Sequence, residues 1–474
     1  MNPKVFHGPV LAVATIALVG CTYFQRNSQD FDSHHQRAAM SLAGLESLAP
    51  DEPVLLTEES GLSDYLAYAA LNNPGLEAAF NRWKAALEQI PQVKAMPDPR
   101  FTYRYYIQEV ETRVGPQKQG LGLSQTFPWF GKLDLQGDAA TRAAEAQRYA
   151  FEAEKLKLFF RVKEAYYEYY YLYRNIQITE ENIELLKSFA GVLETRYEAS
   201  RTTHPELIRI QVELGKLEDR RDTLLEFRGP IVSRLNASLN RDPNAQLPWP
   251  GSFEIETITL DERQLLDWMR HHNPDIQILE AEFTQTQTEI EIAQKGYYPD
   301  VTVGFDWIDT GNATGANKPS DSGQDAMMAS VSLNLPIWYD SLDAGVREAE
   351  YRSLAAKAAT AQRRNDLAAD LKMSLYQFRD AQRKISLFRD TLIPKAIESV
   401  KVTEVAFRGG QASFMDMLDA QRVLLEFQLS YERALADHQK KLAQMEMLVG
   451  KQIGLDPTLP VEPEEAVEPL AATD

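Results

Sequence analysis

Few residues of this 474-residue sequence combine the type and the spacing that chemistry requires. His271 and His272 are adjacent, so their side chains would point apart on a helix, and we expect both on the surface. Met327-Met328 could bind a soft metal, but bare methionine pairs usually serve as packing residues. The motifs GxxxxGKS, GxxxxGKT, GxSxG and HExxH do not occur, and no GxGxxG follows a predicted strand. The sequence therefore predicts no enzyme, no cofactor and no metal site.

Cys21 is the only cysteine, which excludes an internal disulfide framework and a thiolate metal cluster. It follows Leu18-Val19-Gly20, at the end of an apolar stretch that is too short to span a bilayer as a helix. This arrangement resembles a bacterial lipobox, in which the cysteine thiol receives a diacylglyceryl group. Thr22 is not the aspartate that would retain such a lipoprotein at an inner membrane. We therefore predict a lipoprotein signal peptide at 1–20 and lipidation of Cys21, with a small buried cysteine as the alternative.

The composition excludes two large classes of protein. The chain carries 50 Lys and Arg against 69 Asp and Glu, a formal net charge of −19, whereas a duplex nucleic-acid binder needs clustered basic residues. Only 44% of the residues are hydrophobic, and the repeated apolar runs of about 20 residues that a multi-helix transporter needs are absent. We read 21–60 as an N-terminal linker and predict that the acidic, proline-rich end, 455–474, is disordered.

The remainder of the sequence contains an internal repeat, in which two similar units follow each other with an offset of about 200 residues. Asn73-Pro74 opens a helical stretch in the first half, and Asn273-Pro274 does the same in the second. Further matches follow in the same order with a near-constant offset. We therefore predict two repeats, 61–250 and 251–454, each with a short helix, two strands and a long helix pair.

Apolar and polar residues alternate in four short segments, the period-2 pattern of β-strands. The alternating apolar positions are Phe101, Tyr103, Tyr105 and Ile107; Leu121, Leu123 and Phe127; Val301, Val303, Phe305 and Trp307; and Ala329, Val331, Leu333 and Leu335. We expect two separated hairpins, with polar loops at Glu109 to Lys118 and at Asp309 to Asp325.

Two separated hairpins cannot satisfy their own edges. One solution is a soluble sheet that packs one face on a core. The other is a membrane barrel, whose strands of about 10 residues turn apolar side chains outward and polar ones inward. Four strands are too few to close a barrel, because even the smallest has about 8, so this solution requires an oligomer.

Four segments predict helices far longer than those of ordinary globular proteins. At 1.5 Å per residue, a helix of sixty-odd residues would be roughly 100 Å long. Pro394 should kink the helix that contains it, because proline removes a backbone donor. The predicted helices are 132–200, 206–240, 342–407 and 413–449.

Two motifs in these elements resemble segments of the TolC-type outer-membrane efflux factors, and the resemblance covers nearly the whole mature chain. The first, Leu123 to Lys132, is similar to segments of the family branch that works with heavy-metal and drug pumps of the RND type. Lipidated members are common in the family. The second, Gly409 to Gln421, resembles the family's periplasmic hairpin tip. The resemblance implies an α+β membrane protein, a homotrimer whose 12-stranded barrel, with four strands from each chain, continues into an α-helical coiled-coil tunnel. It also implies a periplasmic adaptor (membrane fusion) protein and an inner-membrane pump as partners.

The resemblance also implies one functional site. In the family, two acidic residues three apart line the narrowest point of the tunnel, and Asp416 and Asp419 match them. Residues at i and i+3 share a helix face, so both carboxylates could project into one lumen. The alternative is an exposed acidic pair near a helix start, where the macrodipole favours carboxylates. The sequence departs from the family pattern at Ala412, where some members carry an arginine, and the first-half counterparts of the pair are Glu206 and Arg209.

The leading functional hypothesis is therefore an outer-membrane exit duct for metal cations or small toxic compounds. The alternative is a lipid-anchored coiled-coil scaffold or adaptor that spans the periplasm without a pore. A scaffold has no use for apolar strand faces in register, so the strands favour the duct. A periplasmic enzyme is a third possibility, but none of the catalytic motifs named above supports it.

Overall fold

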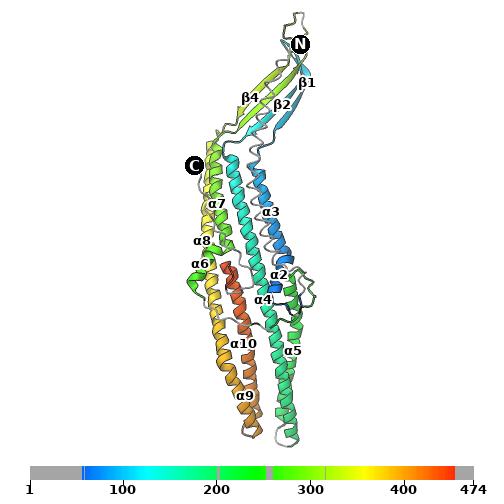
Figure 1. Cartoon of the computed structure of the whole chain (residues 1–474), viewed down its shortest axis with the longest axis vertical. Helices are drawn as coiled ribbons and strands as arrows, with labels where there is room; N and C mark the ends of the chain where they lie inside the picture. The colour runs from blue at the N-terminus through cyan, green and yellow to red at the C-terminus, as the bar shows by residue number, and fades with distance from the viewer. Residues whose placement is uncertain are drawn as a thin grey trace. The chain divides into compact units, whose positions relative to one another are not determined.

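The computed structural model describes residues 56–57, 59–199, 203–251, 253, 260–314 and 317–453 (Figure 1). The predicted signal peptide, Cys21, most of the linker and the acidic tail lie outside these residues. Among the described residues, no helix has both the length and the apolar character of a membrane span. In chain order the elements are α2 (Leu62–Asn72), α3 (Pro74–Lys94), β1 (Arg100–Thr112), β2 (Gly115–Phe127), α4 (Lys132–Glu198), α5 (His204–Ser238), α6 (Glu262–His272), α7 (Pro274–Gln294), η1 (Lys295–Tyr297), β3 (Val301–Thr310), β4 (Ala326–Leu333), α8 (Tyr339–Leu387), η2 (Phe388–Leu392), α9 (Ile393–Arg408) and α10 (Phe414–Val449).

The chain forms two compact units, and each contains residues from both predicted repeats. The first unit, called the sheet unit here, holds all four strands together with α2, α3, α7 and the first parts of α4 and α8. The second, called the helical unit, holds the rest of α4 and α8 with most of α5, and α6, η2, α9 and α10. The described residues of the sheet unit lie within 56–162, 232–248 and 273–367. Those of the helical unit lie within 163–231, 249–272 and 368–453.

The two Asn-Pro pairs begin helices, as the sequence predicts. The side chain of Asn73 accepts hydrogen bonds from the backbone N–H groups of Gly75 and Leu76, which caps α3. Asn273 accepts one from Ile276 and caps α7. Proline suits the first position of each helix, because its missing N–H would have no partner there. A further helix, α2 or α6, precedes each of them, so each half contains two short helices where we expected one.

The four strands form one antiparallel sheet in the order β1-β2-β3-β4. The expectation of two separated hairpins is therefore wrong, because β2 pairs with β3 along almost its whole length. The expected polar loop from Glu109 to Lys118 is also wrong, since β1 continues to Thr112 and β2 begins at Gly115. Gly115 has a φ of +137°, and a Cβ there would lie 1.6 Å from the carbonyl oxygen of Gly311, so only glycine fits this turn.

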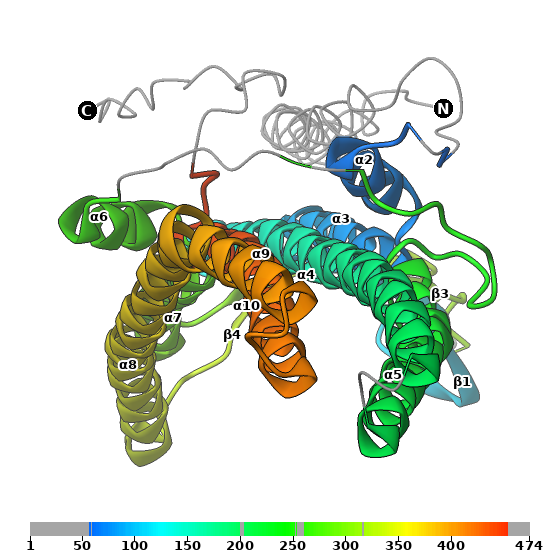
Figure 2. The same ribbon diagram turned by 90° about the horizontal axis from the view of Figure 1, so that it is seen from below.

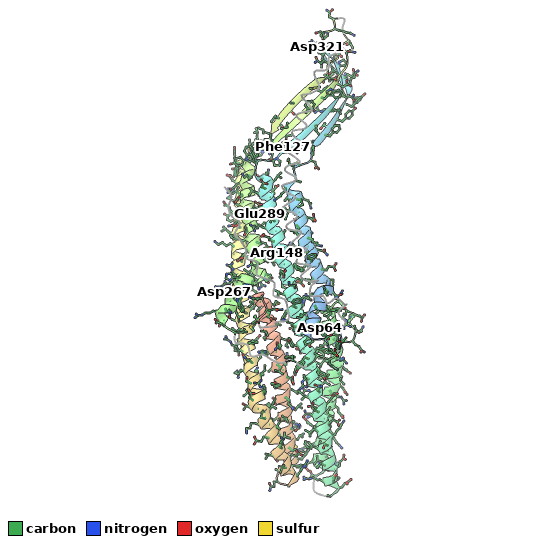
Figure 3. All side chains as sticks on the ribbon, viewed as in Figure 1. Asp64, Phe127, Arg148, Asp267, Glu289 and Asp321 are labelled. Carbon is green, nitrogen blue, oxygen red and sulfur yellow. The ribbon has the colours of Figure 1, made fainter. Side chains whose placement is uncertain are left out.

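The loop between β3 and β4 lies at the end of the sheet that is remote from the helices. Figure 3 shows this arrangement, with Phe127 at one end of the sheet and Asp321 at the other. Arg113, in the β1–β2 turn, forms an ion pair with Asp321. The N–H of Gly323 donates to the carbonyl of Val114 at 2.8 Å. These contacts fasten the loop to the neighbouring hairpin.

The register gives the sheet one apolar face and one polar face. One row on the apolar face runs from Phe101 through Leu123 and Phe305 to Ala329. The large apolar side chains of this face are exposed, Tyr105 at 69% and Val331 at 71% among them. The opposite face carries Ser, Thr and Gly at most positions. The predicted alternation is thus confirmed, and the apolar side chains of this face are exposed in the part of the chain that the structure describes.

The helical unit has a core that α4, α5 and α10 build together, with α9 beside α10 (Figure 2). Its side chains include Leu193 of α4, Ile210 of α5 and Phe414 of α10, each at most 1% exposed. Near Pro394 the backbone changes to the π-helical turn η2, which separates α8 from α9. This interruption agrees with the kink that the sequence predicts, because the proline cannot donate a backbone hydrogen bond.

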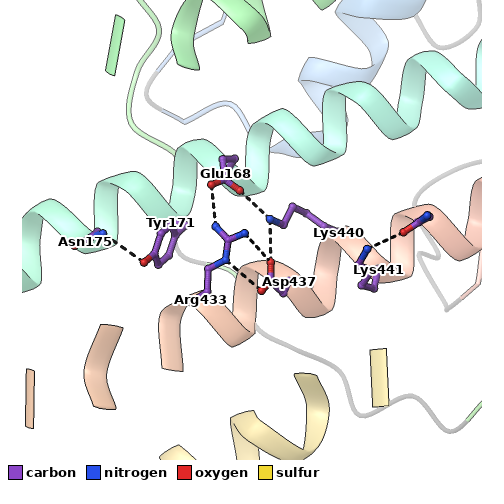
Figure 4. A network of polar contacts seen from close by, with 8 residues as sticks. Glu168, Tyr171, Asn175, Arg433, Asp437, Lys440 and Lys441 are labelled. Carbon is purple, nitrogen blue, oxygen red and sulfur yellow. Dashed lines mark hydrogen bonds and ion pairs between the residues drawn. The ribbon is translucent and has the colours of Figure 1, made fainter. Parts of the chain in front are cut away.

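Charged side chains join α4 to α10 beside this core (Figure 4). Glu168 of α4 accepts from Arg433 at 2.9 Å and from Lys440 at 2.8 Å, and both cations also contact Asp437. Burial by itself raises the pKa of Glu168, but the two cations outweigh it and hold the pKa below its usual value. The pairing keeps these half-buried groups charged and fixes the register of the two helices.

His438 of α10 is a buried histidine whose protonation should destabilise the folded protein. Its ring is 1% exposed and stacks on Phe378 of α8 at 4.2 Å, and neither ring nitrogen has a hydrogen-bond partner among the described residues. Burial lowers the pKa of His438 to about 4. The unfolded chain protonates near the ordinary pKa of about 6.5, so this residue should leave stability unchanged above that pH. As the pH falls from about 6.5 to 4, it should lower the free energy of unfolding by up to about 3 kcal/mol.

The measurement is the thermal midpoint, by circular dichroism, at neutral pH and at pH values down to about 5. His438→Phe should reduce the loss of midpoint on acidification, because phenylalanine cannot take up the proton. His272→Phe, at an exposed position of α6, is the matched control. On acidification its thermal midpoint should fall by as much as that of the wild type. Identical acid sensitivity in His438→Phe and wild type would contradict the assignment.

Candidate functional site

The predicted site lies at the connection between α9 and α10, at one end of the helical unit. The chain leaves α9 at Arg408 and turns through Gly409 and Gly410, the second of which has a left-handed φ of +74°. The N–H of Gln411 donates back to the carbonyl of Ala406 at 2.8 Å, which closes the last turn of α9. The connection is therefore short and ordered by its own hydrogen bonds.

Ser413 and Asp416 cap the start of α10 reciprocally. The Ser413 Oγ accepts from the backbone N–H of Asp416 at 3.2 Å, and the Asp416 carboxylate accepts from the backbone N–H of Ser413 at 2.9 Å and from its hydroxyl at 2.7 Å. This is a capping box, which satisfies N–H groups that a helix start otherwise leaves without partners. The hydrogen bond from the Ser413 hydroxyl has the largest effect on the pKa of Asp416, and the bond from the Ser413 N–H has the next largest. Both lower this pKa below its ordinary value. Asp416 is thus ionised at neutral pH.

The first turns of α10 separate apolar from charged side chains. Phe414, Met417 and Leu418 are at most 2% exposed and pack into the core of the helical unit. Asp416 and Asp419, called the aspartate pair below, are exposed on the other side of the helix. The predicted shared face is confirmed, because the core fixes which way α10 is turned. That the aspartate pair lines a lumen stays a prediction.

Arg422 links the aspartate pair to α5. Its guanidinium donates to both carboxylate oxygens of Glu213, at 3.1 Å from Nε and 2.6 Å from Nη2, and Nη1 donates to Asp419 at 3.2 Å. The hydrogen bond from Arg422 lowers the pKa of Glu213, a carboxylate that is 13% exposed. Bidentate guanidinium–carboxylate geometry holds the two helices in one register.

Helix α5 begins in a similar way to α10. The carboxylate of Glu206, the counterpart of Asp416, accepts from the backbone N–H of Thr203 at 3.0 Å. Arg196, near the end of α4, donates to the carbonyls of Phe407 and Arg408 at 3.0 and 2.9 Å. The two helix hairpins are therefore joined near their tips by Arg196 and further along by Arg422.

Sequence reasoning found the aspartate pair but missed Arg422, which donates to Asp419, and Glu213, which accepts from Arg422. Arg422 follows Asp419 by three positions, so helix periodicity places it on the same face. Glu213 lies 209 residues before Arg422 in the chain, and no local pattern links it to the pair. The arrangement offers exposed carboxylates to mobile ions. Among the described residues, no group of three His, Cys, Asp or Glu side chains is placed to hold a metal.

Comparison with known proteins assigns the architecture to a family. The model of the family "Outer membrane efflux protein" matches residues 66–223 and 265–451. The chain belongs to this family. It is therefore an outer-membrane efflux channel protein that extends into the periplasm, and a transport component, as the sequence resemblance implied.

Individual relatives are distant but cover most of the chain. The cobalt-zinc-cadmium resistance protein CzcC of Cupriavidus metallidurans is 20% identical over 408 residues, 84% of this chain and 93% of CzcC. Outer membrane protein TolC of Vibrio cholerae is 20% identical over 415 residues, 82% of this chain and 90% of that protein. The crystal structure of CusC matches with a TM-score of 0.70 at 16% identity, over 85% of this chain and 98% of CusC. At such identities the structural likeness establishes the fold.

Proposed function

We propose that three copies of this chain close a 12-stranded barrel in the outer membrane and form the exit duct of a tripartite efflux system. The observation that carries the proposal is the sheet, with its exposed apolar face and the outer edges of β1 and β4. Lipid would cover the apolar face. The β1 edge of one copy beside the β4 edge of the next would supply the missing backbone partners. Four strands from each of three copies make 12.

A lipid-anchored scaffold without a pore is the other candidate. The long helices suit both functions equally well. The exposed apolar face favours the duct, because a scaffold in the aqueous periplasm would have to cover this surface or lose solubility. The polar face favours the duct as well, since a channel lumen needs hydrophilic walls.

The duct has no energy source of its own, so we propose an inner-membrane RND-type pump and a periplasmic adaptor protein as partners. We further propose metal cations or small toxic compounds as the cargo. The likeness to a cobalt-zinc-cadmium resistance protein supports the metal. The division of the chain into two repeats, 61–250 and 251–454, belongs to the same proposal.

We also propose that the mature chain begins at Cys21 and that acyl chains on this residue anchor it in the membrane. Several acyl chains on one residue give stable anchoring, because each buried methylene contributes roughly 0.8 kcal/mol. Cys21→Ser should abolish incorporation of a labelled fatty acid. Equal labelling of the variant and the wild type would contradict the lipid anchor.

The aspartate pair is proposed as the constriction of the duct. Threefold symmetry would bring six carboxylates, two from each copy, into one ring. A ring of like charges concentrates cations by its negative potential. A trivalent cation should gain more from this potential than a monovalent one, and it should block the channel at a much lower concentration.

Replacing both residues with asparagine, in Asp416→Asn/Asp419→Asn, removes these charges and keeps an acceptor for the capping box. We expect the concentration for half block by a trivalent cation to rise by about tenfold or more, because the attraction scales with the charge of the ring. The measurement is single-channel current in planar bilayers. Asp390→Asn/Glu398→Gln is a matched control, since it removes two exposed, ion-paired carboxylates elsewhere in the helical unit. Equal block of both double variants would place the constriction elsewhere.

The lipid-facing role of the apolar face predicts a difference between adjacent positions of β3. Val303→Arg puts a charge on the apolar face, at a cost of roughly 2–4 kcal/mol if the site lies at the bilayer midplane. Thr302→Arg puts the same charge on the polar face and should be tolerated much better. The measurement is the yield of trimer in outer-membrane fractions. Similar yields from the two variants would mean that this face does not contact lipid.

A further inference from the structure

The polar face of the sheet carries one ion pair among uncharged side chains. In the regular register, β2 contributes Gly120, Gly122, Ser124 and Thr126 to this face, and β4 contributes Ala326, Met328, Ser330 and Ser332. The charged residues are Arg100, where β1 begins, and the pair formed by Arg104 of β1 and Asp306 of β3. The pair is the one place along this face where charges of both signs meet.

The pair crosses the intervening strand β2. Arg104 and Asp306 are not on neighbouring strands, so their side chains must reach each other over β2. Gly122 makes this possible, because a Cβ at this position would lie 2.6 Å from the Asp306 carboxylate. Gly120, the direct partner of Arg104, has no side chain either. The strand between the two charges is thus bare where the ion pair passes over it.

The two partners differ in their access to solvent. The side chain of Asp306 is 14% exposed, whereas that of Arg104 is 47% exposed. The Asp306 carboxylate is therefore mostly shielded from solvent, whereas about half of the Arg104 side chain is accessible to solvent on the polar face. The pair is neutral as a whole, and loss of either partner leaves one unit charge of known sign at this place.

We propose that the Arg104–Asp306 pair determines the charge selectivity of the sheet portion of the duct. This inference rests on the proposed function, in which the polar face lines the lumen. With both partners present, the wall is close to neutral at this level, and its field on passing ions is small. With one partner missing, three copies would place three like charges around the lumen and bias the ions that pass.

The experiment is a measurement of reversal potential across planar bilayers, in a roughly tenfold KCl gradient whose dilute side is about 0.01 M, where the Debye length reaches about 30 Å. All variants carry Asp416→Asn and Asp419→Asn, so that the proposed constriction does not mask the sheet. Arg104→Gln leaves Asp306 and should raise the K⁺/Cl⁻ permeability ratio by about twofold or more. Asp306→Asn leaves Arg104 and should lower it by a similar factor. The combination of both substitutions should restore the ratio of the parent.

Arg113→Gln is the matched control. Arg113 is also ion-paired with an aspartate of the sheet unit, but it lies in the turn beyond the strands, so its loss should shift the permeability ratio much less than the loss of Arg104 does. A parent that forms no channel would contradict the proposed function itself. A conducting parent with unchanged ratios in Arg104→Gln and Asp306→Asn would overturn this inference alone. So would shifts of the same sign in both, or a shift in Arg113→Gln as large as that in Arg104→Gln.

Discussion

Backbone hydrogen bonding at the edges of the sheet is the constraint on which the rest of the molecule depends. In the part of the chain that the structure describes, β1 and β4 each pair with a single strand, so each presents one outer edge of N–H and C=O groups. In lipid an unpaired group of this kind costs several kcal/mol. In the function proposed above, lipid covers the exposed apolar face, and lipid in turn forbids open edges. Under that proposal the sheet is a fraction of a closed barrel, and it becomes stable only beside further copies.

The helical unit is subject to a different constraint. Its long helices must keep a defined axial register against one another. Apolar packing alone permits sliding, since neighbouring turns of a helix present similar surfaces. Glu168, Arg433 and Lys440 fix α4 against α10, and Glu213 and Arg422 fix α5 against α10. The buried Phe414, Met417 and Leu418 then decide which face of α10 carries the aspartate pair. Orientation of the candidate site is thus a consequence of core packing.

Periodicity in the sequence predicts the strands, the long helices, the Asn-Pro helix starts and the apolar face, because each depends on residues that are close in the chain. Pairing between β2 and β3 could not be predicted in this way, since even the paired residues Phe127 and Val301 are 174 positions apart in the chain. The polar residues from Glu109 to Lys118 indicate a loop by composition, yet the backbone continues to pair there. Strand pairing uses backbone groups, and polar side chains do not prevent it where both faces are exposed. The contact of Arg422 with Glu213 was beyond prediction for the same reason of distance, although the face of Arg422 was not.

Amide hydrogen exchange on the purified protein in mild detergent, read by mass spectrometry, tests most directly whether several copies close one barrel. In a closed barrel, β1 and β4 have strand partners on both sides. Their amides should then exchange as slowly as those of β2 and β3, which already have two partners in a single chain. If the amides on the outer edges of β1 and β4 exchange orders of magnitude faster than those of β2 and β3, the edges are open and the barrel does not exist.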